Sequence, residues 1–542
     1  MDTTMIFRAL YRRLMGLFAP DPNEAFGIER PVAPAPSQPT PRATDYDVIV
    51  VGSGLGGLSA AAMLATAGQK VLVVEQADGP GGYARAVTSG PYTIDPAVHV
   101  TAHGGAGQPV DEILRFVGAR DRCTLVRVPE LYEVRFPDLT LRVPCGAEAW
   151  IETHARAFPE QAQAIRQFYD LCAQVFREAH QVSMQISIQS MDEAIEKFPA
   201  LFKYRGASVA EVVDELIADP KCRAAVTAIW PYTGLPPSKC SFLFFAQALT
   251  NIVQGVYTSI GGFGRLVDAF VAGLEQHGGE LLCGTSVSQI AVENERVTGI
   301  VTRDGRQITA PVVISNADAR QTIQQLVGTE HVAKGFARRV ERLRPSLSAC
   351  VLAAASTLDL RALGPAHQTL AYRHWDHEQT YRDILAGVPG AISISAPSVL
   401  DPSLAPAGEH LLTVTALAPY QTEIPWEQAA DGYRDTLLDE VECVFPGFRA
   451  GLTFTECFTP HTFQQATLNY HGAAYGWENA PDQMATRRLN HQAPVGGLYL
   501  SGHWTQPGGS FRVIVSGMHV ARMVAAAAGL GEPIPHFEPP EP

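Results

Sequence analysis

Three glycines, Gly52, Gly54 and Gly57, and an acid, Glu75, have the types and spacing of a dinucleotide-binding turn. The first glycine permits a tight turn, the second lets backbone approach a pyrophosphate, and the third lets a helix pack closely on a strand. The helix N-terminus then faces the phosphate charge, and the carboxylate accepts hydrogen bonds from ribose hydroxyls. Because an acid at Glu75 disfavours a 2′-phosphate, the pattern predicts FAD or NAD rather than NADP.

The residues around these glycines predict the elements that position them. The apolar run 48–51 predicts a strand, the small-residue run 58–67 predicts a helix that stops at Gly68, and the apolar run 71–74 predicts a second strand. A glycine pattern alone is a weak signal, because such turns are common in α/β proteins. The agreement of strand, helix and acid favours a dinucleotide-binding unit over an ordinary turn.

A pair of adjacent glycines, Gly81-Gly82, follows Glu75 closely and is itself followed by Arg85. Such a sequence can be only a turn, or it can bring backbone amides and a guanidinium to a pyrophosphate or a flavin edge. Its position favours the second interpretation.

A short apolar strand is predicted near the C-terminus over 497–500, with Gly502 behind it, and a helix is predicted from Val513 to Ala527. The two elements can be an ordinary buried strand and helix. If the N-terminus of the helix points at a flavin, it stabilises negative charge on the reduced ring.

Three histidines, His99, His103 and His503, are candidates for acid–base work or for polarising a flavin, because histidine titrates near neutrality. The alternative for each is a structural residue held by hydrogen bonds. We take His99, His503 and Arg85 as the catalytic candidates, with Arg85 as a flavin contact.

The bulk composition excludes several classes of protein. The chain has 542 residues and a formal net charge of −14, which predicts two or more domains and makes nucleic acid an unsuitable partner. Its nine cysteines are scattered and contain no CxxC pair, so we expect reduced thiols and neither a metal site nor a disulfide framework.

The first 44 residues differ from the rest. Apolar residues recur at helical spacing over 1–19 and arginines lie between them, which predicts an amphipathic helix that lies on a membrane surface or docks on protein. The arginines interrupt any apolar core of a signal peptide. The proline-rich stretch 20–44 predicts an extended linker.

The middle of the chain divides into a helical part and a strand-rich part. Residues 150–250 are mainly helical and densely apolar, which suits either a core or the wall of a tunnel for a long apolar ligand. Residues 283–317 alternate in polarity around a turn at Asp304-Gly305, which predicts a β-meander that returns into the sheet.

Together these motifs resemble the phytoene desaturase, carotenoid isomerase and retinol saturase family of FAD-dependent enzymes, from about Asp45 to Gly529. The resemblance implies an α/β fold with a Rossmann-like FAD-binding domain of the amine-oxidase type, built from discontinuous segments, and a mixed α+β substrate domain. The expected FAD-binding segments are 45–130, 255–320 and 485–530, and the expected substrate-binding segments are 131–254 and 321–484.

The resemblance also implies which residues hold FAD, with Val287 on the adenine side. One departure is His503-Trp504, where the family commonly has an acid after the glycine of the terminal strand, and another is Ser510-Phe511-Arg512 in place of small residues. The expected contacts are Gly52, Ser53, Gly54, Leu55, Gly57, Glu75, Gln76, Gly82, Arg85, Val287, Gly502, His503, Arg512 and Val513.

The activity that the resemblance implies is FAD-dependent chemistry at carbon–carbon bonds of a long apolar isoprenoid or polyene, by desaturation or saturation. One alternative is cis-trans isomerisation with reduced FAD and no net redox change. Others are an amine or alcohol oxidase with the same fold and a non-enzymatic escort protein. Only one dinucleotide turn is visible, so we expect no separate NAD(P)H domain.

The expected partners are a lipophilic small-molecule substrate and, through residues 1–19, a membrane surface or another protein. No run of 18 apolar residues occurs, so a membrane-spanning helix is not predicted. We expect a cytoplasmic protein, peripheral on the inner face of the membrane.

Overall fold

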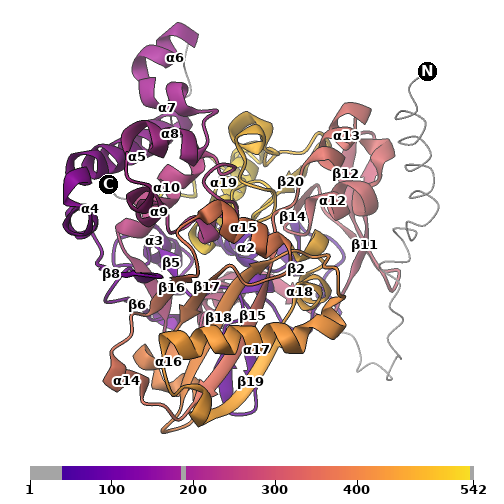
Figure 1. Ribbon diagram of the computed structural model, residues 1–542. Helices are drawn as coiled ribbons and strands as arrows, with labels where there is room; N and C mark the ends of the chain where they lie inside the picture. The colour runs from indigo at the N-terminus through magenta and orange to yellow at the C-terminus, as the bar shows by residue number, and fades with distance from the viewer. Residues whose placement is uncertain (1–39, 185–190, 538–542) are drawn as a thin grey trace, which may run out of the picture. The chain divides into compact units, whose positions relative to one another are not determined.

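The computed structural model describes residues 40–184 and 191–537 (Figure 1). The predicted helix over 1–19 and most of the predicted linker lie outside these residues. No helix in the described ranges is long and apolar enough to cross a membrane.

A five-stranded parallel sheet carries the dinucleotide turn. Its strands come from four distant parts of the chain, which is why the sequence pattern looks discontinuous. The order across the sheet is β10 (Glu280–Leu282), β2 (Val71–Val74), β1 (Val48–Val51), β14 (Val312–Ser315) and β20 (Leu498–Leu500). Most of these strands are continuous apolar runs because both faces of the sheet are covered.

Side chains alternate between the two faces of this sheet. Val48 and Val50 pack among the helices α2 (Leu55–Thr66), α11 (Gly264–Gln276) and α19 (Ser510–Ala527). Ile49 and Val51 pack on the opposite side, towards the antiparallel meander β11 (Val287–Glu293), β12 (Arg296–Thr302) and β13 (Gln307–Thr309). The predicted meander is therefore confirmed, and its return strand β14 pairs with β1.

The predicted start of the C-terminal helix at Val513 is wrong. The helix α19 begins at Ser510, directly after Gly509, whose φ of +124° turns the backbone into the helix. Ser510 and Phe511 are not small apolar residues, so the periodicity of small side chains begins later than the helix itself.

A seven-stranded mixed sheet forms a second layer, and helix α17 (Trp426–Val444) packs along one of its faces (Figure 1). Trp426, Leu437 and Val441 make that contact. Its strands, in order across the sheet, are β19 (Leu452–Phe458), β15 (Ser348–Ser356), β18 (His410–Ala418), β17 (Ala391–Ser395), β16 (Gln368–Tyr372), β7 (Tyr132–Phe136) and β8 (Leu139–Val143).

The densely apolar stretch is a helical bundle, as its periodicity predicts. Its core contains Trp150, Phe168 and Phe242. The helices are α4 (Ala147–Ala157), α5 (Ala162–Met184), α6 (Met191–Lys197), α7 (Pro199–Tyr204), α8 (Val209–Leu216), α9 (Pro220–Val226) and α10 (Phe242–Val253).

The remaining elements connect these layers. They are the helices α3 (Pro109–Phe116), α12 (Ala319–Gln321), α13 (Lys334–Arg342), α14 (Leu360–Leu363), α15 (His377–Leu385), α16 (Pro397–Leu400) and α18 (Pro460–Thr467), and the strands β3 (Val87–Ser89), β4 (Tyr92–Ile94), β5 (Thr101–Ala102), β6 (Leu125–Arg127) and β9 (Val256–Ser259).

The crossing of α2 and α19 depends on a glycine, which can be tested by substitution. A Cβ at Gly517 would lie 2.0 Å from Ser59 Oγ and 2.4 Å from the Gly56 carbonyl oxygen. We expect Gly517→Ala to destabilise the fold by about 1–3 kcal/mol, because the helices must move apart. Thermal unfolding of the purified proteins measures this effect as a lower Tm.

The matched control is Gly432→Ala in α17, where nothing lies within 4 Å of the new Cβ. Alanine is the better helix former at that open position, so we expect stabilisation of about 0.5–1 kcal/mol. Equal Tm values for the two variants would show that the close crossing of α2 and α19 does not limit stability.

Candidate functional site

The turn between β1 and α2 has the geometry that its glycines predict. Gly52 has a φ of +92°, and its N–H donates to the carbonyl of Val74 at 2.9 Å. A Cβ at Gly57 would lie 2.3 Å from the Gly52 carbonyl oxygen, so helix and turn approach as closely as two backbones can. Helix α2 has neither a side-chain cap nor an acid in its first turn. Its first amides are thus available to an anionic group.

Glu75 lies at the end of β2 with only 8% of its surface exposed. One carboxylate oxygen accepts from Ser53 N at 2.8 Å and from Ser53 Oγ at 2.6 Å. The other accepts from Ala77 N at 2.8 Å. These three bonds hold the carboxylate against the glycine turn, where the predicted ribose acceptor has to be.

Asn316 is a residue of this turn that sequence reasoning missed. A Cβ added at Gly54, Gly56 or Gly502 would lie 2.6–2.7 Å from its side-chain amide. Its backbone N–H donates to the carbonyl of Val51 at 2.8 Å. Asn316 therefore joins β1, the start of α2 and the end of β20 at one point. A polar residue directly after the last apolar run of the predicted meander was the available signal.

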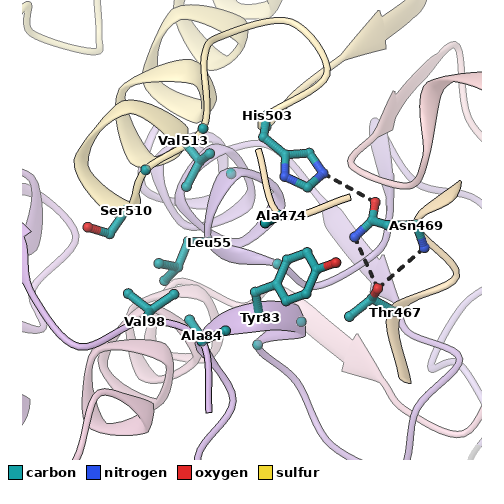
Figure 2. A pocket seen from close by; sticks show the side chains of 18 of the residues that line it. Leu55, Tyr83, Ala84, Val98, Thr467, Asn469, Ala474, His503, Ser510 and Val513 are labelled. Atoms are coloured by element: carbon teal, nitrogen blue, oxygen red, sulfur yellow. Dashed lines mark hydrogen bonds between the residues drawn. The ribbon is translucent and has the colours of Figure 1, made fainter. Parts of the chain in front are cut away.

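A single cavity of about 460 Å³ begins at this turn and runs on between the second sheet and the helical bundle. Figure 2 shows Leu55 and Val513 on one side of it and Tyr83, His503 and Asn469 on the other, with the ring centroids of Tyr83 and His503 6.0 Å apart. Of the predicted contact residues, all except Gly57 line the cavity. Gly57 is covered because it lies against the backbone of Gly52.

The far part of the cavity is mainly apolar. Helix α10 contributes Ala248 and Ile252, and the second sheet contributes Ala349, Val351 and Leu417. The polar groups of this part include the Tyr232 hydroxyl, which donates to Gln368 Oε1 at 2.7 Å. The dinucleotide end and the apolar end thus form one continuous space.

Arg85 lines the cavity and also forms an ion pair. Its Nη1 lies 2.7 Å from Asp78 Oδ1, and 42% of its side chain is exposed. The guanidinium lies at the rim beside Gly79. Its contact with a pyrophosphate or flavin stays a prediction.

Two of the three candidate histidines line the cavity. His99 Nε2 donates to the Asp95 carbonyl at 2.9 Å, and His503 Nε2 donates to Asn469 Oδ1 at 3.2 Å (Figure 2). Burial lowers the pKa of His99 to about 4. Burial, with a smaller contribution from Arg488, lowers the pKa of His503 to about 3. Both rings are therefore neutral at pH 7.

His103 is not among the lining residues. Its Nε2 lies 2.6 Å from Asn251 Oδ1, and its ring packs against Phe511 with the centroids 4.5 Å apart. These contacts support the structural interpretation of this histidine. Within the described ranges, no group of histidine, cysteine or acidic side chains is arranged to hold a metal ion.

Known proteins resemble this chain in sequence over nearly its whole length. The family model for flavin containing amine oxidoreductase matches residues 55–525. A lycopene-forming phytoene desaturase of a Paracoccus species is 29% identical over 86% of this chain and 94% of its own. Prolycopene isomerase 1 of an Oncidium hybrid cultivar is 27% identical over 91% of this chain and 86% of its own.

Solved structures share the fold at lower identity. Cyclohexylamine oxidase from Brevibacterium oxydans has a TM-score of 0.62 and 17% identity, over 90% of this chain and 100% of that one. An oxidoreductase from Methanosarcina mazei has a TM-score of 0.61 and 19% identity, over 89% of this chain and 99% of that one.

These findings confirm the predicted fold class and cofactor. The uncapped start of α2, the carboxylate of Glu75 and the cradle of glycines around Asn316 fit the pyrophosphate and ribose of FAD. Because the family model covers 471 of the 542 residues, from 55 to 525, the chain belongs to the flavin containing amine oxidoreductases and is an FAD-dependent oxidoreductase.

Proposed function

We propose that this enzyme acts on carbon–carbon bonds of a long apolar isoprenoid or polyene, by carotenoid-type desaturation or saturation. The observation that carries the proposal is the continuity of the cavity, which runs from the dinucleotide turn into an apolar space. A chain without charge gains free energy by leaving water for such a space. The curated relatives are named for the formation of lycopene from phytoene and for the isomerisation of prolycopene, which supports the same substrate class.

The cavity wall argues against an amine oxidase. A cationic amine needs a negative charge to offset its desolvation, and a neighbouring cation disfavours it. Glu75 is the one carboxylate among the residues that line the described cavity, and it is already held by Ser53 at the dinucleotide end. The described lining therefore offers a cationic substrate no further carboxylate, and the guanidinium of Arg512, which also lines it, would repel such a substrate.

We assign the predicted contact residues their roles on this basis. The amides of the first turn of α2 bind the pyrophosphate, and Glu75 accepts from the ribose. When bound, FAD supplies the hydride chemistry. The apolar wall orients the substrate and keeps water out, which is how the protein lowers the barrier.

His99 is the residue that we propose to move a proton. Its Nε2 donates to the Asp95 carbonyl, so the Nδ1 atom carries the lone pair. A proton leaves the carbon next to the one that loses hydride, and Nδ1 accepts it. His503, held by Asn469, is the other histidine of the cavity wall and orients the substrate there.

Isomerisation is the second candidate, because a prolycopene isomerase matches this chain over 91% of its length. In that reaction reduced FAD returns unchanged and no hydrogen is lost. The same cavity serves both reactions, so the mass of the product distinguishes them.

Residues 1–19 lie outside the described part of the chain, and we propose that they bind a membrane surface or a partner protein. An apolar substrate dissolved in a bilayer would reach the cavity more readily from an enzyme held there. We place the enzyme at the cytoplasmic face of that membrane. Deletion of residues 1–44 distinguishes an enzyme from an escort protein. An escort protein would lose its binding to membrane or partner and have no turnover, whereas an anchored enzyme would keep its turnover in detergent.

The cofactor site is tested by Glu75→Ala. Removal of the ribose acceptor should weaken FAD binding by about 10- to 100-fold, the cost of one or two charge-assisted hydrogen bonds. Fluorescence titration of the apoprotein with FAD measures the change. Glu341→Ala, an exposed acid on α13, is the control and should bind like wild type. If Glu75→Ala binds FAD with wild-type affinity, the proposed cofactor site is wrong.

The activity is tested with phytoene and a poly-cis carotenoid in liposomes, incubated anaerobically with the oxidised and then the reduced enzyme. We expect a product lighter by two hydrogens from the oxidised enzyme, with a matching loss of the visible absorbance of the oxidised flavin. Mass-resolved chromatography detects it. An unchanged mass with altered retention would assign the isomerase instead, and turnover of amines alone would exclude both.

The apolar end is tested by Ala248→Phe on α10. The larger side chain enters the cavity, so we expect at least a tenfold loss of polyene turnover with unchanged FAD content. Ala526→Phe, on the exposed side of α19, is the matched control. Equal turnover of the two variants would place the substrate elsewhere.

A further inference from the structure

Arg512 lies in the first turn of α19 and reaches towards α10. Its Nη1 donates to Gln247 Oε1 at 3.1 Å, and its guanidinium carbon lies 4.9 Å from the centre of the Phe244 ring. Its Nη2 is enclosed by protein and has no hydrogen-bond partner. Arg512 lines the same cavity as Gly502, His503 and Val513.

No carboxylate offsets this charge among the ion pairs of the described residues. A second enclosed guanidinium, that of Arg488, is in the same situation and donates to the carbonyls of His503 and Gln506 and to Asn479 Oδ1. Burial lowers the pKa of Arg512 to about 10 and that of Arg488 to about 9. Both groups therefore remain cations at neutral pH.

A buried cation without an anion is costly, so its presence calls for a negative charge that arrives later. An apolar hydrocarbon brings none. Transfer of a hydride to a flavin adds two electrons and one proton, and it leaves the ring system with one negative charge. That charge forms in the cavity that Arg512 lines.

We propose that Arg512 supplies the positive charge that stabilises the anionic reduced flavin and thereby raises the reduction potential of FAD in this enzyme. The guanidinium acts through the low dielectric of its buried surroundings, and the N-terminus of the 18-residue helix α19 adds to the same field. Arg488 does not line the cavity. It holds the backbone around His503 by hydrogen bonds and stabilises the same negative charge more weakly. The inference rests on FAD as cofactor and is independent of the substrate.

The test compares FAD-loaded Arg512→Met and Arg512→Lys with wild type. Sulfite adds to oxidised flavin and places a negative charge on the ring, so its dissociation constant reports the stabilisation of that charge without any substrate. We expect Arg512→Met to bind sulfite at least tenfold more weakly and to lower the midpoint potential by about 30 mV. For a two-electron couple, that shift corresponds to a tenfold change in the equilibrium constant of reduction. Arg512→Lys should restore most of both values.

The matched control is Arg522→Met, which removes an equal charge from the same helix outside the cavity lining and should change neither value. If Arg512→Met does not retain FAD, Arg512→Gln takes its place with the same expected shifts, because glutamine still bonds Gln247. Wild-type sulfite affinity and potential in the neutral variant would overturn the inference. An unchanged potential together with tenfold weaker binding of retinoate would also overturn it. That result would assign the guanidinium to an oxygen-bearing end of the substrate.

Discussion

The close approach of two backbones, at Gly52 and Gly57, is the constraint on which the rest of this structure depends. With no Cβ at Gly57, helix α2 packs on the turn and directs its uncapped amides into the cavity. The same closeness recurs where Gly517 lets α19 lie against α2. Helix starts from opposite ends of the chain therefore meet at one cavity, and both present positive ends to it.

Electrostatic asymmetry follows from that arrangement. The cavity wall has one carboxylate, held at the dinucleotide end, and the charge of Arg85 is paired with Asp78, whereas Arg512 and two helix N-termini contribute positive charge. The histidines add none, since burial keeps them neutral. Such a site suits a cofactor that is anionic at its pyrophosphate and becomes more so on reduction, together with a substrate that carries no charge.

Much of the fold could be predicted because local physics decides it. The strands 48–51 and 71–74 and the meander follow from runs or alternation of apolar residues, and each is found where it was predicted. The start of α19 was misplaced since Gly509, rather than the small-residue pattern, sets it. Asn469 and Arg488 were missed, because single polar residues outside a motif give no signal until the chain is folded.

The sequence by itself determined the dinucleotide turn, the acid that follows it and the family, because these depend on backbone conformation and short-range spacing. Tertiary structure alone decided how the side chains of the cavity are buried and paired. It brought Arg512 to α10, set His99 and His503 on the wall, and kept His103 away from it. The reason is physical: burial, pairing and pKa depend on neighbours hundreds of residues away, and no local pattern encodes which neighbours those are.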